Sequence, residues 1–245
     1  MSGISEDIQN RKIALLIDGE NAPPSKIENI IMETEKYGIT TIRRIYGDWT
    51  QNEMTSWKAT LQKHAITPIQ QFRNTKGKNA TDSALIIDAM EIMYERSVEG
   101  FCIASSDSDY TRLATRMREK GFFVMGIGEE KTPGAFVNAC NKFSYVELLT
   151  PPSTKTEEGT KIEILLKSNE PLSLLKQAFD MSVQVNGYAQ LGTLGNALLK
   201  IDPSFDPRKY GYKQLSQMIK AYPKSFDIKH DEDKGPTAMY VKMKE

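Results

Sequence analysis

Apolar runs alternate with segments of helical periodicity along the first 150 residues. Ile13 to Ile17 are five consecutive apolar residues, a pattern typical of a strand that is buried on both faces of a parallel sheet. A proline-containing helix start follows them, so the Asp18-Gly19 step does not predict a hairpin turn. The same alternation predicts strands at 40–46, 67–72, 101–104, 122–127 and 145–148, and helices at 25–37 (closed by Gly38), around 54–61, and at 82–94, 113–121 and 133–141. The sequence therefore predicts an α/β/α fold, in which a parallel sheet lies between two layers of helices.

The pattern changes after residue 150. Residues 151–160 are polar except for their prolines, which predicts a linker between a first domain at 1–150 and a second domain at 161–245. Beyond the linker the periodicity predicts helices at 172–182, 190–200 and 212–222, followed by strands at 226–229 and 238–243. Three helices and a terminal hairpin describe a smaller winged-helix-like domain, a variant of the helix-turn-helix architecture.

Composition narrows the function classes. The 245 residues are 39% hydrophobic and carry 32 basic and 32 acidic side chains, so the overall charge does not indicate a nucleic-acid partner. Cys102 and Cys140 are the two cysteines, and both lie in apolar segments. We expect them to be reduced core residues, which argues against a disulfide framework or a cysteine metal site. No apolar run suits a signal peptide or a membrane span, so we expect a cytoplasmic protein without membrane association.

Four carboxylates fall where strands end or where a helix begins: Asp18, Asp82, Asp107 and Asp109. Because ligands bind beyond the carboxyl ends of parallel strands, we expect these side chains to meet at one edge of the sheet. Asp82 or Asp109 alone would be typical of a helix cap. Capping does not explain why Asp18 and Asp107 both follow buried strands directly. The set predicts a site for Mg²⁺ or Mn²⁺, which prefer carboxylate oxygens and serve nucleases by activating water.

Other polar residues near these strand ends have weaker claims. Asn21 follows Asp18 by about one helical turn and is expected beside it. Asp48 ends another strand and is a lower-ranked candidate, while Asp88, two turns into its helix, is expected to support the structure. His64 and His230 lack ligand spacing and receive no catalytic role.

Basic residues gather in two stretches. No acidic residue lies between Glu53 and Asp82, whereas five basic residues do, and we expect Arg73, Lys76 and Lys78 among them to hold a phosphate chain. A second stretch without acids, 207–226, interleaves tyrosines with basic residues, among which Arg208, Lys209, Lys213 and Lys220 are predicted RNA contacts. The alternative for both stretches is a solvated basic face. Tyr212 also has the helical spacing of a core residue.

Three motifs carry a family resemblance. The order LLIDGEN, KNATDSALIIDAM and SSDSDY resembles the NYN domain, a branch of the PIN-like nucleases, over residues 12–149. The resemblance implies a Mg²⁺- or Mn²⁺-dependent ribonuclease in which Asp18, Asp82, Asp107 and Asp109 form the metal site, with Asn21 beside the first. Ser106 stands where a glycine is common in the family, a departure from the pattern. Residues 163–242 resemble the OST-HTH/LOTUS domain, which implies RNA binding or docking of a protein partner.

Three functions compete on this basis. The first is a metal-dependent ribonuclease, expected to cut single-stranded RNA internally, with a C-terminal module that binds RNA or a protein partner. The second is a non-catalytic RNA-binding adaptor, against which the intact set of four Asp residues argues. The third is a small-molecule phosphohydrolase with Asp18 as nucleophile. Such enzymes often carry a second Asp two positions later, where this chain has Glu20.

Overall fold

The computed structural model describes residues 10–72, 80–149, 170–230 and 239–244. The chain divides into two compact units, Met1–Pro151 and Pro152–Glu245. Within the described residues, no helix is both long and apolar enough to cross a membrane.

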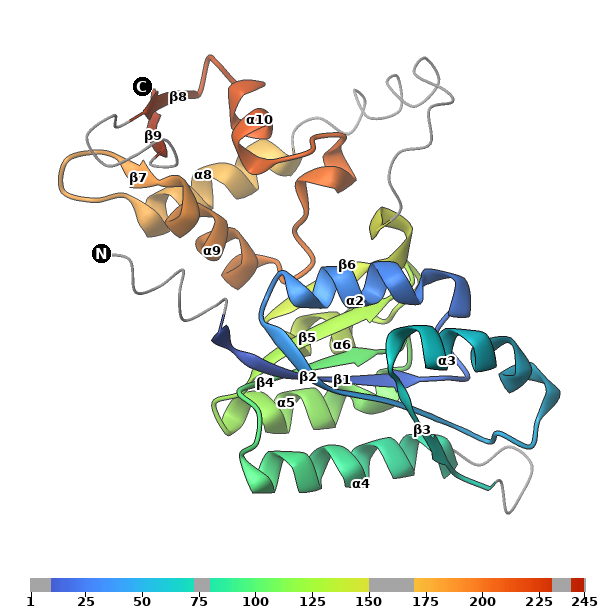
Figure 1. The fold of residues 1–245 in the computed structure, drawn as a ribbon. Coiled ribbons are helices and arrows are strands. Elements are labelled where there is room, and N and C mark those ends of the chain that lie inside the picture. The colour runs from blue at the N-terminus through green and yellow to red at the C-terminus, as the bar shows by residue number, and fades with distance from the viewer. Residues whose placement is uncertain (1–9, 73–79, 150–169, 231–238, 245) are drawn as a thin grey trace, which may run out of the picture. The chain divides into compact units, whose positions relative to one another are not determined.

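The first unit is built on a parallel sheet with strand order β3-β2-β1-β4-β5-β6 (Figure 1). All of the pairings between neighbouring strands are parallel. β1 occupies a central position, and its residues Ile13 to Ile17 are inaccessible to solvent, as their uninterrupted apolar run predicts. The strands are β1 (Lys12–Asp18), β2 (Ile39–Gly47), β3 (Thr67–Gln70), β4 (Gly100–Ala104), β5 (Phe123–Gly128) and β6 (Lys142–Tyr145).

Helices cover both faces of this sheet, which confirms the α/β/α prediction (Figure 1). Successive side chains of β1 point to opposite faces, so Ile13, Leu15 and Ile17 enter one core cluster and Ala14 and Leu16 enter the other. The first cluster contains residues of α2 (Ile27–Glu35) and of the 3₁₀ helix η2 (Asn52–Trp57), and α3 (Lys58–His64) packs against it through Leu61. The second cluster contains residues of α4 (Ala80–Glu95), α5 (Thr111–Glu119) and α6 (Gly134–Ala139).

Two differences from the predicted boundaries of the first unit have a clear structural cause. The helix predicted at 25–37 opens with the 3₁₀ turn η1 (Pro24–Lys26) and ends at Glu35, so Gly38 is not its cap. Gly38 instead has φ of 155°, and a Cβ there would lie 2.3 Å from the carbonyl oxygen of Arg11. The strand predicted at 145–148 lies at Lys142–Tyr145 and is followed by the 3₁₀ helix η4 (Val146–Leu149). The apolar pattern did not predict this strand, because two of its buried residues, Lys142 and Ser144, are polar.

The second unit contains three α-helices and a small antiparallel sheet among its described residues, which confirms a smaller winged-helix-like domain. The helices are α8 (Glu170–Ser182), α9 (Leu191–Ile201) and α10 (Leu215–Lys220), and the strands, in spatial order, are β7 (Ala189–Gln190), β9 (Met239–Met243) and β8 (Phe226–His230). Its apolar core includes Leu175, Leu198, Met218 and Val241. The third helix is shorter than its predicted span of 212–222, because the 3₁₀ helix η5 (Pro207–Tyr210) and an extended Gln214 precede it.

Both cysteines behave as the sequence predicts. Cys102 and Cys140 are free thiols in the core of the first unit. Burial raises the pKa of Cys102 to about 12, so this thiol stays protonated at neutral pH.

Candidate metal centre

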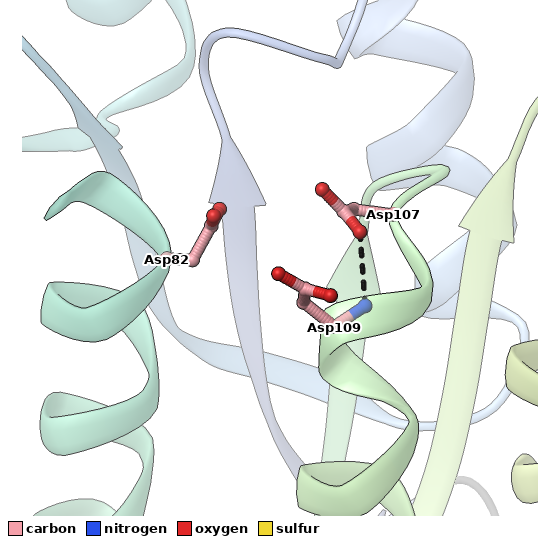
Figure 2. Close-up of side chains that lie close together, drawn as sticks. All are labelled: Asp82, Asp107 and Asp109. Atoms are coloured by element: carbon pink, nitrogen blue, oxygen red, sulfur yellow. Dashed lines mark hydrogen bonds between the residues drawn. The ribbon is translucent and has the colours of Figure 1, made fainter. Parts of the chain in front are cut away.

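Three carboxylates converge at the carboxyl edge of the parallel sheet (Figure 2). One carboxylate oxygen from each of Asp82, Asp107 and Asp109 lies within 4.8 Å of the others. Asp82 comes from the first turn of α4, whereas Asp107 and Asp109 come from the segment that follows β4. The predicted meeting of residues distant in sequence is therefore seen for these three side chains.

The turn after β4 explains how Asp107 and Asp109 are placed. Asp107 has an extended backbone and is the N-cap of the 3₁₀ helix η3 (Ser108–Tyr110), because its side chain accepts a hydrogen bond of 2.9 Å from the backbone N–H of Asp109. This bond folds the chain back so that the two carboxylates lie side by side. Asp82 and Asp107 are half-buried and Asp109 is exposed, so the cluster opens to solvent.

Asp18 lies behind this cluster and is inaccessible to solvent. Its Oδ1 accepts hydrogen bonds from the backbone N–H groups of Glu20 and Asn21 (3.1 and 3.3 Å). Its Oδ2 accepts from Asn21 Nδ2 (2.7 Å) and Ser105 Oγ (2.9 Å). Burial raises the pKa of Asp18, and these hydrogen bonds partly oppose that effect. Asp18 and Asn21 are therefore paired as predicted, but Asp18 is not a member of the three-carboxylate group.

Two residues that sequence reasoning missed connect Asp18 to the cluster. The hydroxyl of Tyr110 donates a hydrogen bond of 2.7 Å to Asp82 Oδ1 and lies 3.4 Å from Asp18 Oδ2. Ser105 donates to Asp18 and accepts from the backbone N–H of Asp107 (3.1 Å). The signal for them in the sequence is their position at the two ends of the SSDSDY motif.

The electrostatics of the cluster favour a cation. Burial raises the pKa of Asp82, and the charges of Asp18, Asp107 and Asp109 raise it further, while the bond from Tyr110 opposes them. Mutual repulsion of this kind is relieved by a bound cation, and an all-carboxylate donor set suits a hard ion such as Mg²⁺ or Mn²⁺. The residues present therefore fit the metal that the sequence predicts.

Further contacts hold the surrounding loops. Thr81 Oγ1 donates to Glu20 Oε1 (2.8 Å), which ties the segment after β1 to the start of α4. Trp57 is buried in the core, and its Nε1 donates to the carbonyl oxygen of Gly19 (3.1 Å). The first bond connects the segment after Asp18 to the helix that carries Asp82, and the second connects the same segment to η2.

Neither of the remaining acidic candidates joins the cluster among the described residues. Asp48 accepts hydrogen bonds from Thr50 Oγ1 (2.6 Å), Gln70 Nε2 (3.0 Å) and Gln51 Nε2 (3.1 Å), which lower its pKa and brace the ends of β2 and β3. Asp88 accepts from Arg44 and from the hydroxyl of Tyr46. Asp88 is structural, as expected.

The structure describes only some of the basic residues that are predicted to contact RNA. Arg73, Lys76 and Lys78 lie outside the described residues. In the second unit, Lys209, Lys213 and Lys220 are exposed.

Arg208 is engaged within its own unit. Its Nε and Nη2 atoms donate to the carboxylate of the buried Asp206, with a closest distance of 2.6 Å. The tyrosines of this stretch, at positions 210, 212 and 222, are half-buried and pack against the core of the unit.

Comparisons with known proteins agree with the two units. The NYN domain model matches residues 12–148, and the OST-HTH/LOTUS domain model matches residues 160–237. No curated protein matches the chain.

Two solved structures are similar to parts of it. A protein of unknown function from Vibrio parahaemolyticus is 16% identical, with a TM-score of 0.46, over 55% of this chain and 92% of that one. An uncharacterized protein from Nitrosomonas europaea is 33% identical, with a TM-score of 0.30, over 39% of this chain and 86% of that one.

The two matched domains indicate which class of protein carries the acidic cluster. NYN is a PIN-like nuclease domain, and OST-HTH/LOTUS is an RNA-binding domain, so their combination supports a nuclease with an RNA-binding module. The chain belongs to the NYN domain family, and an OST-HTH/LOTUS domain follows its NYN domain.

Proposed function

We propose that this chain is a Mg²⁺- or Mn²⁺-dependent ribonuclease that cuts single-stranded RNA internally. The observation that carries the proposal is the convergence of Asp82, Asp107 and Asp109 within 4.8 Å at an edge open to solvent. An ion held there would activate water and neutralise charge on the scissile phosphate.

The four acids then have two kinds of role. Asp82, Asp107 and Asp109 would hold the ion, because one carboxylate oxygen of each lies within 4.8 Å of the others. Asp18 supplies a fourth negative charge behind them. Both of its oxygens already accept hydrogen bonds within the protein, so we propose that Asp18 supports the site through its charge. Asn21 anchors Asp18 and, being exposed, stands where it can contact the substrate.

The geometry argues against the phosphohydrolase alternative. A nucleophilic Asp18 would have to attack a phosphorus atom, yet its carboxylate is inaccessible to solvent and accepts four hydrogen bonds. Glu20 accepts a bond from Thr81 instead of lying free as a general acid. The adaptor alternative remains testable by activity, and the intact three-carboxylate cluster argues against it.

Substrate binding is assigned to the basic stretches. We propose that Lys209, Lys213 and Lys220 of the second unit contact RNA phosphates, since all three are exposed. Arg73, Lys76 and Lys78 are proposed to hold RNA near the cluster, because they precede Asp82 directly in the chain. Arg208 stays a proposed RNA contact, but its guanidinium is paired with Asp206, so we expect it to contribute less than the three lysines. Docking of a protein partner is the competing role for the second unit.

A cleavage assay with matched variants tests the proposal. The full chain is incubated with end-labelled and circular single-stranded RNA, and with DNA of the same sequence, in Mg²⁺, Mn²⁺ or EDTA. We expect cleavage of both RNA forms with either ion and none in EDTA. Asp82→Asn should be inactive, whereas Glu91→Gln, an exposed acid on the same helix, should be fully active. Cleavage that persists in EDTA, or RNA binding without any cleavage, would overturn the proposal.

A further inference from the structure

The hydroxyl of Tyr110 lies between the buried and the open parts of the acidic site. It is 2.7 Å from Asp82 Oδ1 and 3.4 Å from Asp18 Oδ2. The side chain is inaccessible to solvent, so water does not compete for the hydroxyl. Burial and the nearby charge of Asp18 raise its pKa, which keeps the phenol protonated.

The hydroxyl of Tyr110 can donate its hydrogen bond to only one of the two carboxylates. A tyrosine hydroxyl can donate only one hydrogen bond. Asp18 Oδ2 already receives the amide of Asn21 and the hydroxyl of Ser105, whereas Asp82 Oδ1 is the nearer acceptor. Tyr110 therefore donates its hydrogen bond to Asp82 Oδ1, and only its phenolic oxygen lies near Asp18.

This bond restrains the one ligand of the cluster that comes from a separate element. Asp107 and Asp109 are already held together by the bond within their own turn. Asp82 approaches from the first turn of α4, and the described donor that fixes its carboxylate is Tyr110.

Tyr110 is itself placed by the segment that carries the other two acids. It ends η3, directly after Asp109, and its ring lies in the core with its centroid 6.3 Å from that of Phe136. A rigid ring in this position can fix the Asp82 carboxylate relative to Asp107 and Asp109.

We propose that Tyr110 is a positioning residue that sets the metal affinity of the cluster by orienting the Asp82 carboxylate. The inference rests on the proposed metal-dependent function. Hydrogen bonds to ligating carboxylates typically change metal affinity or activity by about 10- to 100-fold when removed. Tyr110→Phe leaves the core volume nearly unchanged and removes only the oxygen.

A second buried tyrosine provides a matched control. Tyr46 is also inaccessible to solvent, and its hydroxyl donates to Asp88, which is not part of the cluster. Tyr46→Phe and Tyr110→Phe each remove one buried tyrosine–carboxylate hydrogen bond. A difference between them in metal binding therefore cannot come from a general loss of stability.

The test measures Mn²⁺ binding to the full chain by electron paramagnetic resonance, without RNA. We expect a dissociation constant about 10- to 100-fold higher in Tyr110→Phe and within about twofold of wild type in Tyr46→Phe. In the Asp82→Asn background, Tyr110→Phe should have no further effect, because it acts through Asp82. In cleavage assays the Mn²⁺ requirement should rise by the same factor, while the KM for RNA stays constant and saturating Mn²⁺ restores kcat.

The outcomes separate this inference from the proposed function. Equal Mn²⁺ affinity in the two Phe variants overturns the role of Tyr110 and leaves the ribonuclease intact. A Tyr110 effect on Mn²⁺ affinity in a chain that never cuts RNA supports Tyr110 and overturns the ribonuclease. Failure of the wild-type chain to bind Mn²⁺ overturns both.

A measurement on the wild-type chain guards against misfolding of the variant. The hydroxyl proton of Tyr110 should exchange slowly with solvent and stay visible by NMR when Mg²⁺ is added. Its disappearance on metal binding would show that the bond to Asp82 is broken in the loaded site, and would overturn the inference.

Discussion

The acidic cluster of the first unit and the basic stretch of the second are assembled in opposite ways. Asp82 comes from a helix start and Asp107 and Asp109 from a strand end, yet their oxygens meet within 4.8 Å. The candidate RNA contacts of the second unit, by contrast, all come from one stretch, 208–220, and its lysines Lys209, Lys213 and Lys220 only need to be exposed. Holding an ion requires convergence, whereas holding a phosphate chain requires only a run of accessible charges.

Each region also contains a buried carboxylate that holds a neighbouring side chain in place. In the first unit this group is Asp18, which fixes the loop that carries Asn21. In the second unit it is Asp206, which caps η5 and binds the guanidinium of Arg208. The comparison therefore predicts that variants of the exposed groups change function, and that variants of the buried groups change stability.

The largest expected effect is loss of cleavage in the acidic cluster. Asp107→Asn removes a ligand charge but keeps a side-chain oxygen that can cap η3. We expect the rate constant to fall by at least about 10³-fold, or about 4 kcal/mol in activation free energy. The variant should stay folded, with a melting temperature in EDTA no lower than that of wild type, because it relieves repulsion on Asp82. Single-turnover cleavage of labelled RNA measures the loss, and Glu91→Gln serves as the control. Cleavage at the wild-type rate would remove Asp107 from the site.

The next effect is a weaker RNA affinity when the basic stretch is neutralised. Lys209, Lys213 and Lys220 are replaced together by Ala in the full chain. Each lost phosphate contact reduces the log-log salt slope of single-strand binding by about 0.7, so three contacts give a change of about 2. Affinity should therefore fall by about 100-fold at 0.1 M salt and by little at 1 M.

A charge-matched control decides whether the effect is local. Alanine at Lys176, Lys200 and Lys229 changes the net charge of the second unit by the same amount. If the two triple variants bind RNA equally well by fluorescence anisotropy, the predicted contacts are wrong, and protein docking becomes the better role for this unit.

A smaller effect is expected when Arg208 is changed, and it concerns stability. Arg208→Ala removes the guanidinium that is bound to the buried Asp206. Leaving that carboxylate partly unpaired should cost about 1–2 kcal/mol, since the pair is only partly buried and the backbone N–H of Arg208 still donates. Calorimetry should show a lower melting temperature for the second unit, whereas alanine at the exposed Lys213 should not change it. Equal melting temperatures would show that the ion pair contributes nothing.

The sequence predicted the cluster better than its surroundings, for a physical reason. Parallel strands place their carboxyl ends at one edge, so an Asp directly after an apolar run has a known destination. The pattern predicted Asn21 beside Asp18, but it could not tell that Asp18 would be enclosed, because Ser105 reaches it only after β1 and β4 pair. The role of Tyr110 could not be predicted for the same reason, since its hydrogen-bond partner Asp82 is 28 residues away in the chain.

The second unit shows the opposite limit. Its helices follow from apolar spacing, and their order was predicted. The two-residue strand β7 was missed, because Ala189–Gln190 is too short to show alternation and forms only by pairing with β9. Arg208 was grouped with the exposed lysines because the acidic residue that holds it, Asp206, lies just outside the stretch without acids. Local charge patterns show where charged residues lie along the chain, whereas the tertiary structure decides which of them are paired within the protein and which are exposed to a binding partner.

The smallest expected effect separates Asp18 from Asp82 in the absence of metal. The pKa of Asp82 is raised in the folded chain, mainly by burial and then by the neighbouring carboxylates, so its ionised form opposes folding. The stability that a protonated Asp82 allows is present at low pH and is lost as pH rises through the folded pKa.

In EDTA at pH 7, Asp82→Asn should therefore raise the melting temperature of the first unit by about 1–3 °C, because its amide oxygen can still accept from Tyr110. This gain should vanish below the ordinary aspartate pKa. Burial also raises the pKa of Asp18, but Asp18→Asn should lower the melting temperature, because an amide nitrogen would face donors now bound to either oxygen, and this loss outweighs removal of the charge. Calorimetric melts of both variants between pH 3 and pH 8 test this contrast, and a shift of the same sign in both would show that the buried and open carboxylates are equivalent.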